Sequence, residues 1–277
     1  MKYLITGANG FLAKELKDYW STTDIELTTI TRQQVDLTDS VAVKDYFANN
    51  KFDVVVHTAV RGGRRNDPNS INQLFDNLKM FDNLLAAQES YKFLFNFGSG
   101  AEFDRRNAID NCSESVINTA TPLDYYGLSK NLITKKILEI NENVYNLRLF
   151  GCFGPHEEEQ RLLKNSFKKV WSNKQPIVYQ DKKMDYFFSH DVARVIDAIV
   201  LAGDKQINKD INLCYDHKYL LSELVEMMTD VRPHIELGNM SSPYTGKNDR
   251  LKSMRVKLIG LEEGIKICKQ SWSKSLS

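Results

Sequence analysis

Short apolar runs alternate with longer amphipathic segments through the first half of the chain. Residues 53–57 form a β-branched run that is typical of a strand buried on both faces. In residues 11–20, by contrast, Phe11, Leu12 and Leu16 recur at helical spacing. The pattern predicts strands at residues 2–6, 25–31, 53–57, 92–97 and 144–150, and helices at residues 11–20, 39–49, 71–88 and 126–141.

This regular alternation predicts an α/β fold with a doubly wound parallel sheet that helices cover on both faces. The pattern changes after Gly154 and Pro155, where three successive glutamates precede a basic helix. The later predicted elements are helices at 162–172, 189–201, 221–228 and 258–267, and strands at 177–180 and 211–214. Because no repeat or flexible linker separates the two parts, we expect the second part to form a lobe interleaved with the first.

The bulk composition excludes several classes of protein. With 277 residues, 42% hydrophobic and 26% charged, the chain is expected to bury a sizeable core. The net charge of +1, with acids and bases interspersed, gives no reason to expect nucleic acid as a partner. The four cysteines form no C-x-x-C pair and the five histidines no paired spacing, so neither a disulfide framework nor a metal site is predicted. No apolar run approaches about 18 residues, and the start leads directly into a strand, so we expect a soluble, cytoplasmic protein with no membrane partner.

A glycine-rich turn follows the first predicted strand, and a helix starts directly after it. Gly7, Gly10 and Ala13 give a G-x-x-G-x-x-A spacing. Glycine accepts positive φ and lets the backbone approach a phosphate, while a helix N-terminus contributes amide donors and its dipole. In this strand–turn–helix context the spacing indicates a dinucleotide site, and a merely tight turn is the alternative.

The segment after the second predicted strand bears on cofactor choice. Sites selective for NAD commonly place an acid here against the ribose hydroxyls, whereas this chain has Arg32. An arginine favours the 2′-phosphate of NADP, the alternative being a side chain that points to solvent. Asp36 and Leu37, further on, are placed to cover the adenine edge.

Tyr126 and Lys130 open a predicted helix and lie at i and i+4, on one face. An ammonium close to a phenol lowers the pKa of the tyrosine, which suits proton exchange with an alcohol or a ketone. Ser99 follows a predicted strand, where its hydroxyl can hold the substrate oxygen. Tyr179 and Lys183 have the same spacing, but Tyr179 ends a predicted strand, so that pair does not share a helical face.

With these motifs in this order, the chain resembles the extended short-chain dehydrogenase/reductase family, within its group of nucleotide-sugar epimerases, dehydratases and reductases. The resemblance covers essentially the whole chain and rests on residues 6–12, 35–39, 57–59, 83–87, 147–150 and 154–155. Residues 31–32, 58–63 and 154–157 are most similar to GDP-fucose synthase-like reductases. It implies a Rossmann-type dinucleotide-binding domain (1–153, with 185–213 returning to it) and a smaller interleaved C-terminal substrate-binding lobe (154–184 and 214–277).

The resemblance also implies roles for individual residues. The expected catalytic residues are Ser99, Tyr126 and Lys130, with Lys130 anchoring the ribose and lowering the pKa of Tyr126. The expected cofactor-binding residues are Gly7, Asn9, Gly10, Phe11, Leu12, Arg32, Asp36, Leu37, His57, Thr58, Ala59, Asn77, Tyr126, Lys130 and Phe150. The expected substrate-binding residues are Arg61, Ser99, Gly100, Lys183 and Arg250.

Departures from the family pattern narrow the chemistry. Dehydratases of this group carry Asp-Glu where this chain has Gly100 and Ala101, and GDP-fucose synthase-like enzymes carry an epimerising cysteine where it has Ala101. Their partner histidine is absent at residues 160–161. Glu102 is the one nearby carboxylate, and strand-like alternation points it away from the face bearing Ala101. Without a base for a carbon-bound proton, ketone reduction or alcohol oxidation remains.

Two diphosphate contacts of the family are also absent, because Gly151 stands in place of an asparagine and Met184 in place of an arginine. A lysine (Lys182 or Lys183) or Arg250 is the candidate replacement.

The sequence therefore predicts an NADP(H)-dependent reductase that acts on the keto group of a nucleotide-linked sugar. A nucleotide-sugar C4-epimerase with tightly bound NAD and a non-catalytic cofactor-binding protein of the same fold are the alternatives. By family analogy we expect a homodimer built on helices 71–88 and 126–141.

Overall fold

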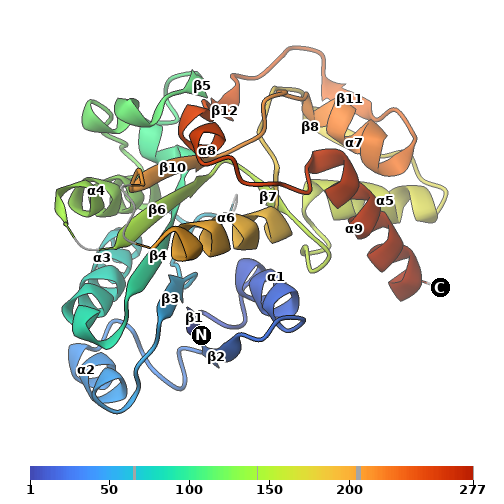
Figure 1. The fold of residues 1–277 in the computed structure, drawn as a ribbon. Helices are drawn as coiled ribbons and strands as arrows, with labels where there is room; N and C mark the ends of the chain where they lie inside the picture. Colours follow the sequence, from blue (N-terminus) through green and yellow to red (C-terminus); the bar gives the residue numbers. More distant parts are fainter. Residues whose placement is uncertain (65–66, 142, 204–206, 277) are drawn as a thin grey trace.

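The centre of the molecule is a parallel sheet. The computed structural model describes residues 1–64, 67–141, 143–203 and 207–276 of the chain, and within them six strands form this sheet in the order β10-β6-β4-β3-β1-β2 (Figure 1). These strands are β1 (Lys2–Thr6), β2 (Glu26–Ile30), β3 (Val54–His57), β4 (Phe93–Ser99), β6 (Val144–Leu149) and β10 (Asp210–Leu213). The expected doubly wound α/β fold is confirmed.

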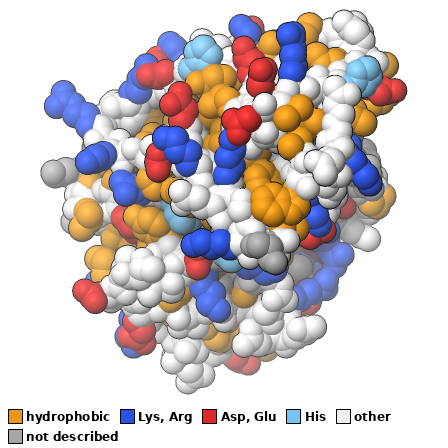
Figure 2. Space-filling model, turned by 90° about the vertical axis from the view of Figure 1, so that its right-hand side faces the viewer, with side chains coloured by type: hydrophobic (Ala, Val, Ile, Leu, Met, Phe, Trp, Pro, Cys, Tyr) orange, Lys and Arg blue, Asp and Glu red, His pale blue; other side chains and the backbone are white. Residues whose placement is uncertain are grey.

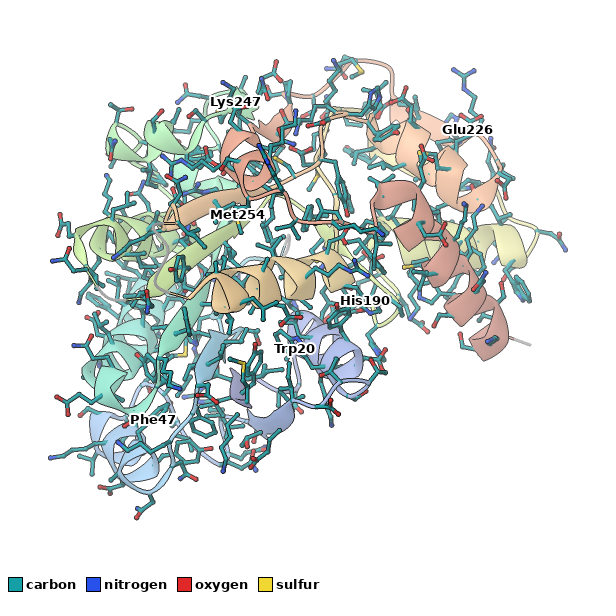
Figure 3. The ribbon with its side chains drawn as sticks, viewed as in Figure 1. Trp20, Phe47, His190, Glu226, Lys247 and Met254 are labelled. Atoms are coloured by element: carbon teal, nitrogen blue, oxygen red, sulfur yellow. The ribbon has the colours of Figure 1, made fainter. Side chains whose placement is uncertain are left out.

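Helices cover both faces of the sheet because successive strand residues point to opposite sides. On one face, residues such as Ile5 and Val56 form a core cluster with side chains of α1 (Phe11–Trp20) and α6 (Ser189–Ala202). On the other, residues such as Leu4 and Val55 pack with α2 (Ser40–Asn49), α3 (Ile71–Ala86) and α4 (Tyr125–Glu139). Trp20 lies between α1 and α6, where its indole donates to Asp197 at 3.0 Å (Figure 3).

A second lobe has its own core and lies beside the sheet (Figure 1). It contains α5 (Leu162–Trp171), α7 (Leu221–Thr229), α9 (Leu261–Leu276), and the paired strands β8 (Ile177–Gln180) and β11 (His234–Leu237). On the face that carries these helices, acidic and basic side chains are interspersed (Figure 2). No described helix is long and apolar enough to cross a membrane.

The chain passes between the two parts more than once. After β8 it re-enters the first part through β9 (Phe187–Phe188), α6 and β10. Short elements fill the junction: β5 (Ile109–Cys112), which pairs with β12 (Tyr244–Gly246), β7 (Cys152–Phe153), which pairs with β9, α8 (Asp249–Ser253), and the 3₁₀ turns η1 (Gln88–Ser90), η2 (Gly100–Phe103) and η3 (Glu114–Asn118).

The last helix differs from its expected bounds of 258–267. It begins at Leu261 because the preceding Gly260 has a φ of +92°, and the amides of Ile259 and Gly260 donate to Asp191. It continues past residue 267 because Trp272, which is 1% exposed, packs in the core of the second lobe.

Candidate functional site

β1 and β3 are neighbours, but the chain leaves them in opposite directions across the sheet. β1 leads through α1 to β2, whereas β3 leads through α3 to β4. Their carboxyl ends are level, because Thr6 pairs with His57. Such a point in an open α/β sheet is where ligands bind, because the two diverging loops leave a crevice between them.

The glycine turn lies at this crevice. Gly7 has a φ of +67°, and a Cβ at this position would lie 2.8 Å from backbone atoms of Ala59, so only glycine fits. The N-cap of α1 is Gly10, which makes no side-chain cap to the first helical amides. These amides therefore remain available to an anion such as a pyrophosphate. The turn and the helix start contain five of the candidate residues: Gly7, Asn9, Gly10, Phe11 and Leu12.

Side chains below the turn hold the ends of the two strands together. Thr6 Oγ1 lies 2.9 Å from His57 Nδ1, and the Thr58 hydroxyl donates to the Thr6 carbonyl at 2.6 Å. Burial lowers the pKa of His57 to about 3, so the imidazole is neutral. In this structure His57 and Thr58 fix the turn, and the backbone of Ala59 forms one wall of it.

Arg32 follows β2, next to the glycine turn, since the Ala8 amide donates to the Ile30 carbonyl. Its Nε donates to the carboxylate of Asp36 at 3.1 Å, and the Arg32 side chain is 64% exposed. Hydrogen bonds from Thr38 lower the pKa of Asp36, so this carboxylate is charged. The absence of an acid near Arg32, which the sequence predicts, is wrong in space, because the loop turns back and brings Asp36 to the guanidinium. Leu37 is buried in the core.

Ser99, Tyr126 and Lys130 meet at the carboxyl end of β4. Tyr126 lies in the first turn of α4, and its phenol lies close enough to Ser99 for the Ser99 hydroxyl to influence its pKa. The Lys130 ammonium donates to the carbonyl of Phe97, two residues before Ser99, at 2.7 Å. The sheet edge and one helix face therefore bring a hydroxyl, a phenol and an ammonium to one place.

Close packing sets the position of α4 against this strand end. A Cβ at Gly127 would lie 2.7 Å from the carbonyl oxygen of Ala101, so glycine allows the helix to approach η2. Asp124 caps the helix through the Gly127 amide and is itself held by Arg105 at 2.8 Å. The first turn of α4, and with it Tyr126, is therefore fixed beside Ser99.

The pKa of Tyr126 differs from the sequence-based expectation. Burial raises it above the ordinary value, and the hydrogen bond with Ser99 only partly opposes that rise. The expected net lowering by Lys130 is therefore wrong, because desolvation of the phenolate is the larger effect. Burial also lowers the pKa of Lys130 to about 8, against the opposing influence of Glu102.

A loop after β3 lies directly against the Tyr126 ring. Gly63 has a φ of +93°, and a Cβ there would lie 2.9 Å from the ring. Asn77 is buried and holds this loop, because its side chain bonds both the amide and the carbonyl of Arg61. Arg61 itself pairs with Asp76 at 2.6 Å. Asn77 thus acts on the loop backbone in this structure.

A second phenol, for which the sequence predicts no role, also lies close to Ser99. The Tyr244 hydroxyl on β12 is 3.5 Å from Ser99 Oγ. Its ring fits over Gly100, where a Cβ would lie 2.7 Å from ring carbon Cζ, and meets Phe150 edge-on at 5.5 Å. Tyr244 is 145 residues from Ser99 in the chain, and no local pattern in the sequence signals this contact.

Glu102 is fully buried, in an ion-pair network below Ser99. It belongs to the 3₁₀ turn η2 rather than to an extended strand, so the alternation argument for its direction was wrong. Its carboxylate accepts from the Ser99 amide at 2.7 Å and from Arg148 at 2.6 Å. Arg148 also pairs with Asp210, at 2.9 Å. These bonds hold the Glu102 carboxylate in the protein interior.

Gly151 and Met184, which stand where the family has two diphosphate-binding residues, lie next to each other. A Cβ at Gly151 would lie 3.2 Å from Cε of Met184. Of the candidate replacement cations, Lys182 lies 5.4 Å from the ring centroid of Tyr244, whereas Lys183 is exposed. Arg250 donates to the Asp210 carbonyl at 2.8 Å, at the opposite end of β10 from the crevice. Of the three candidate cations, Lys182 is thus the one that lies next to the candidate site.

The segment where the family's partner histidine is absent packs against the start of α1. Arg161 lies over the Phe11 ring at 5.2 Å and pairs with the buried Glu157 at 3.2 Å. Burial raises the pKa of Glu157 to about 8, against the opposing charge of Arg161.

Within the described part of the chain, no group of three or more His, Cys, Asp or Glu residues is arranged to hold a metal ion.

Comparison with known proteins bears on the family and the fold of the chain. Residues 3–214 match the NAD dependent epimerase/dehydratase family. A curated relative, GDP-L-colitose synthase of Yersinia pseudotuberculosis, is 29% identical over 109 residues. That match covers 38% of this chain, and this chain spans only 35% of that relative.

Three solved structures superpose on almost the entire chain. The GDP-mannoheptose C4 reductase MlghC of Campylobacter jejuni, with NADP bound, has a TM-score of 0.81 at 19% identity and covers 98% of both chains. A GDP-L-fucose synthetase from Naegleria fowleri has a TM-score of 0.77 at 16% identity, covering 99% of this chain and 93% of that one. WbmG of Bordetella bronchiseptica, in complex with NAD and UDP, has a TM-score of 0.78 at 18% identity, covering 98% and 94%. At these identities the likeness establishes the fold.

Proposed function

The chain belongs to the NAD dependent epimerase/dehydratase family, and we propose that it is an NADPH-dependent reductase of a nucleotide-linked 4-keto sugar. One observation carries the proposal: hydroxyl donors of Ser99 and Tyr126 meet beside a glycine turn, while Glu102 is locked in an ion pair with Arg148. The site thus offers a proton for an oxygen and no free carboxylate for a carbon-bound proton. MlghC, a GDP-mannoheptose C4 reductase of the same fold, supports ketone reduction as the chemistry.

The residues fit the cofactor at two points. The Gly7 turn is a cradle that a Cβ would fill, and the uncapped start of α1 supplies amides for a pyrophosphate. Lys130 offers an ammonium for the ribose hydroxyls, and its pKa of about 8 keeps it largely protonated at neutral pH. NADPH, when bound, supplies the hydride.

Ser99 and Tyr126 carry the proton chemistry. The Ser99 hydroxyl donates a hydrogen bond to the ketone oxygen and orients it, and the phenol of Tyr126 gives its proton to that oxygen as negative charge develops there. Because burial raises the pKa of Tyr126, the phenol is protonated at neutral pH, which is the form that a reduction requires.

The direct test is to offer 4-keto sugars linked to GDP, UDP, dTDP and CDP with NADPH, and to follow loss of NADPH absorbance. We expect turnover with one nucleotide series and a purified protein that takes up NADPH stoichiometrically. Protein that retains NAD through purification and interconverts C4 epimers without added cofactor would support the epimerase instead. Absence of both turnover and cofactor binding would contradict an oxidoreductase function.

Arg32 is expected to set a preference for NADPH over NADH. A charge-assisted hydrogen bond to the 2′-phosphate contributes about 1.5–3 kcal/mol, or about 10- to 100-fold in affinity. Its exposed pair with Asp36 costs little to break, since such pairs contribute about 0–1 kcal/mol. Titration should show this preference, and Arg32→Ala should abolish it while Arg232→Ala, at an exposed site in the second lobe, should not. Equal affinities in the unmodified protein would contradict the assignment.

The enzyme is expected to leave carbon-bound protons untouched. Ala101 offers only a methyl group, and Glu102 is buried against Arg148. A keto sugar incubated in D₂O should therefore gain no deuterium beside the carbonyl above the no-enzyme control, as measured by mass spectrometry. Enzyme-dependent incorporation that Glu102→Gln removes would instead indicate a dehydratase or a 3,5-epimerase.

We also propose a homodimer in which α3 and α4 meet their symmetry mates. These adjacent helices expose large apolar side chains, among them Phe75 (52%) and Leu132 (39%). An isologous interface would remove this surface from water. Light scattering should give twice the chain mass of 31.9 kDa, and Phe75→Glu should shift the protein toward the monomer. A monomer at micromolar concentration in the unmodified protein would contradict this proposal.

A further inference from the structure

Ser99 is flanked by two phenols, of which only Tyr126 has a role in the chemistry proposed above. Tyr126 comes from α4, whereas Tyr244 comes from β12, far along the chain. Hydrogen bonding with Ser99 influences the pKa of both tyrosines, in the lowering direction. The Ser99 hydroxyl thus has two phenols close to it.

Tyr244 is held firmly in this position. Its amide donates to the Lys183 carbonyl at 2.9 Å, and its carbonyl accepts from the Asp185 amide at 3.2 Å. The ring lies against Gly100 and meets Phe150 edge-on. Phe150 in turn packs directly against Gly246, where a Cβ would clash with its ring. The hydroxyl therefore points at Ser99 from a rigid frame.

The donors and acceptors around Ser99 Oγ determine the role of the Tyr244 hydroxyl. A serine hydroxyl has one proton to donate and two lone pairs that accept. The Ala101 amide donates to Ser99 Oγ at 3.2 Å and uses one lone pair. The ketone oxygen of a substrate carries no proton, so Ser99 must donate to it. Because Tyr126 gives its proton to the same ketone oxygen, the second lone pair of Ser99 is left for Tyr244.

We propose that Tyr244 is a positioning residue: its phenol donates to Ser99 Oγ, so that the single Ser99 proton is directed at the ketone oxygen of the substrate. Burial raises the pKa of Tyr244 well above its ordinary value, so the phenol retains the proton that it donates. The 3.5 Å separation is long for this bond, and catalytic hydrogen bonds commonly shorten when the substrate binds. This role rests on the proposed reductase function.

The test is a double-mutant cycle of Tyr244→Phe and Ser99→Ala in the NADPH oxidation assay. Tyr244→Phe keeps the ring against Phe150 and removes only the hydroxyl. We expect kcat to fall about tenfold, the effect of one hydrogen bond, with KM changed less than about twofold. NADPH deuterated at the transferred position should then give a larger isotope effect. In the Ser99→Ala background, Tyr244→Phe should have no further effect, because Tyr244 acts through Ser99.

A matched control is Tyr91→Phe, which removes a phenol bonded to the Leu84 carbonyl at 2.6 Å, outside the site. It should change the unfolding midpoint and leave kcat and the isotope effect unaltered. An unchanged kcat in Tyr244→Phe, in a wild-type enzyme that turns over, would overturn the inference alone. So would a rise in KM that persists in the Ser99→Ala background, since Tyr244 would then bind the substrate itself. A wild type that reduces no keto sugar would overturn the reductase and this inference together.

Discussion

Tyr126→Phe should lower kcat by about 10²- to 10⁴-fold, the range for loss of a general acid. The phenylalanine ring still fits against Gly63, but the ketone oxygen loses its proton donor. NADPH affinity should change little, because the Gly7 turn and Lys130 remain in place. Single-turnover NADPH oxidation measures the first effect, and fluorescence titration of NADPH measures the second.

Tyr179→Phe is the matched control for this prediction. Tyr179 and Lys183 repeat the Tyr-x-x-x-Lys spacing, but Tyr179 lies on β8 and is 55% exposed. Its variant should have unaltered kcat. If Tyr126→Phe retained full activity, the proton would have to come from another group, and Tyr244 would be the first to examine.

The parts of the fold that could be predicted from sequence are those set by local periodicity. β8 has its predicted bounds, and the helix predicted at 39–49 is α2, whose N-cap Asp39 accepts from two helix amides. The glycine turn was predictable because its cause is local: the chain needs glycine where φ is positive, at the end of β1. Tyr244 was not, because its contact with Ser99 depends on how β12 pairs with β5 at the junction of the two lobes.

The reason for the direction of the Glu102 side chain could not be predicted from the sequence pattern. Extended backbone was expected after Ser99, and alternation was used to orient the side chain. The chain instead turns into a 3₁₀ helix, because the Ser99 hydroxyl accepts from the Ala101 amide and the Glu102 carboxylate accepts from the Ser99 amide. Alternation was expected to point the carboxylate away from the face bearing Ala101; in the structure Arg148 and Thr134 hold it in the interior.

Removing Arg148 should have the largest effect on stability. Its guanidinium, fully buried, pairs with Glu102 and Asp210, which are also fully buried. Arg148→Met fits an apolar side chain into this space but leaves two carboxylates without their counter-ion, which costs about 3–5 kcal/mol. Urea unfolding of the two proteins measures the difference. Arg106→Met removes an exposed arginine paired with Asp104 and should cost about 1 kcal/mol or less.

The loss should also depend on pH, with a sign that identifies its cause. Burial already raises the pKa of Glu102, and Arg148 opposes that rise. Without Arg148 the folded protein binds a proton at Glu102 more tightly than the unfolded chain does. Stability of Arg148→Met should therefore fall more steeply than that of the wild type as pH rises from about 5 to about 8, because folding then requires an uncompensated charge or a bound proton. A pH-independent deficit would point instead to lost packing over Phe103, which the guanidinium contacts at 4.4 Å.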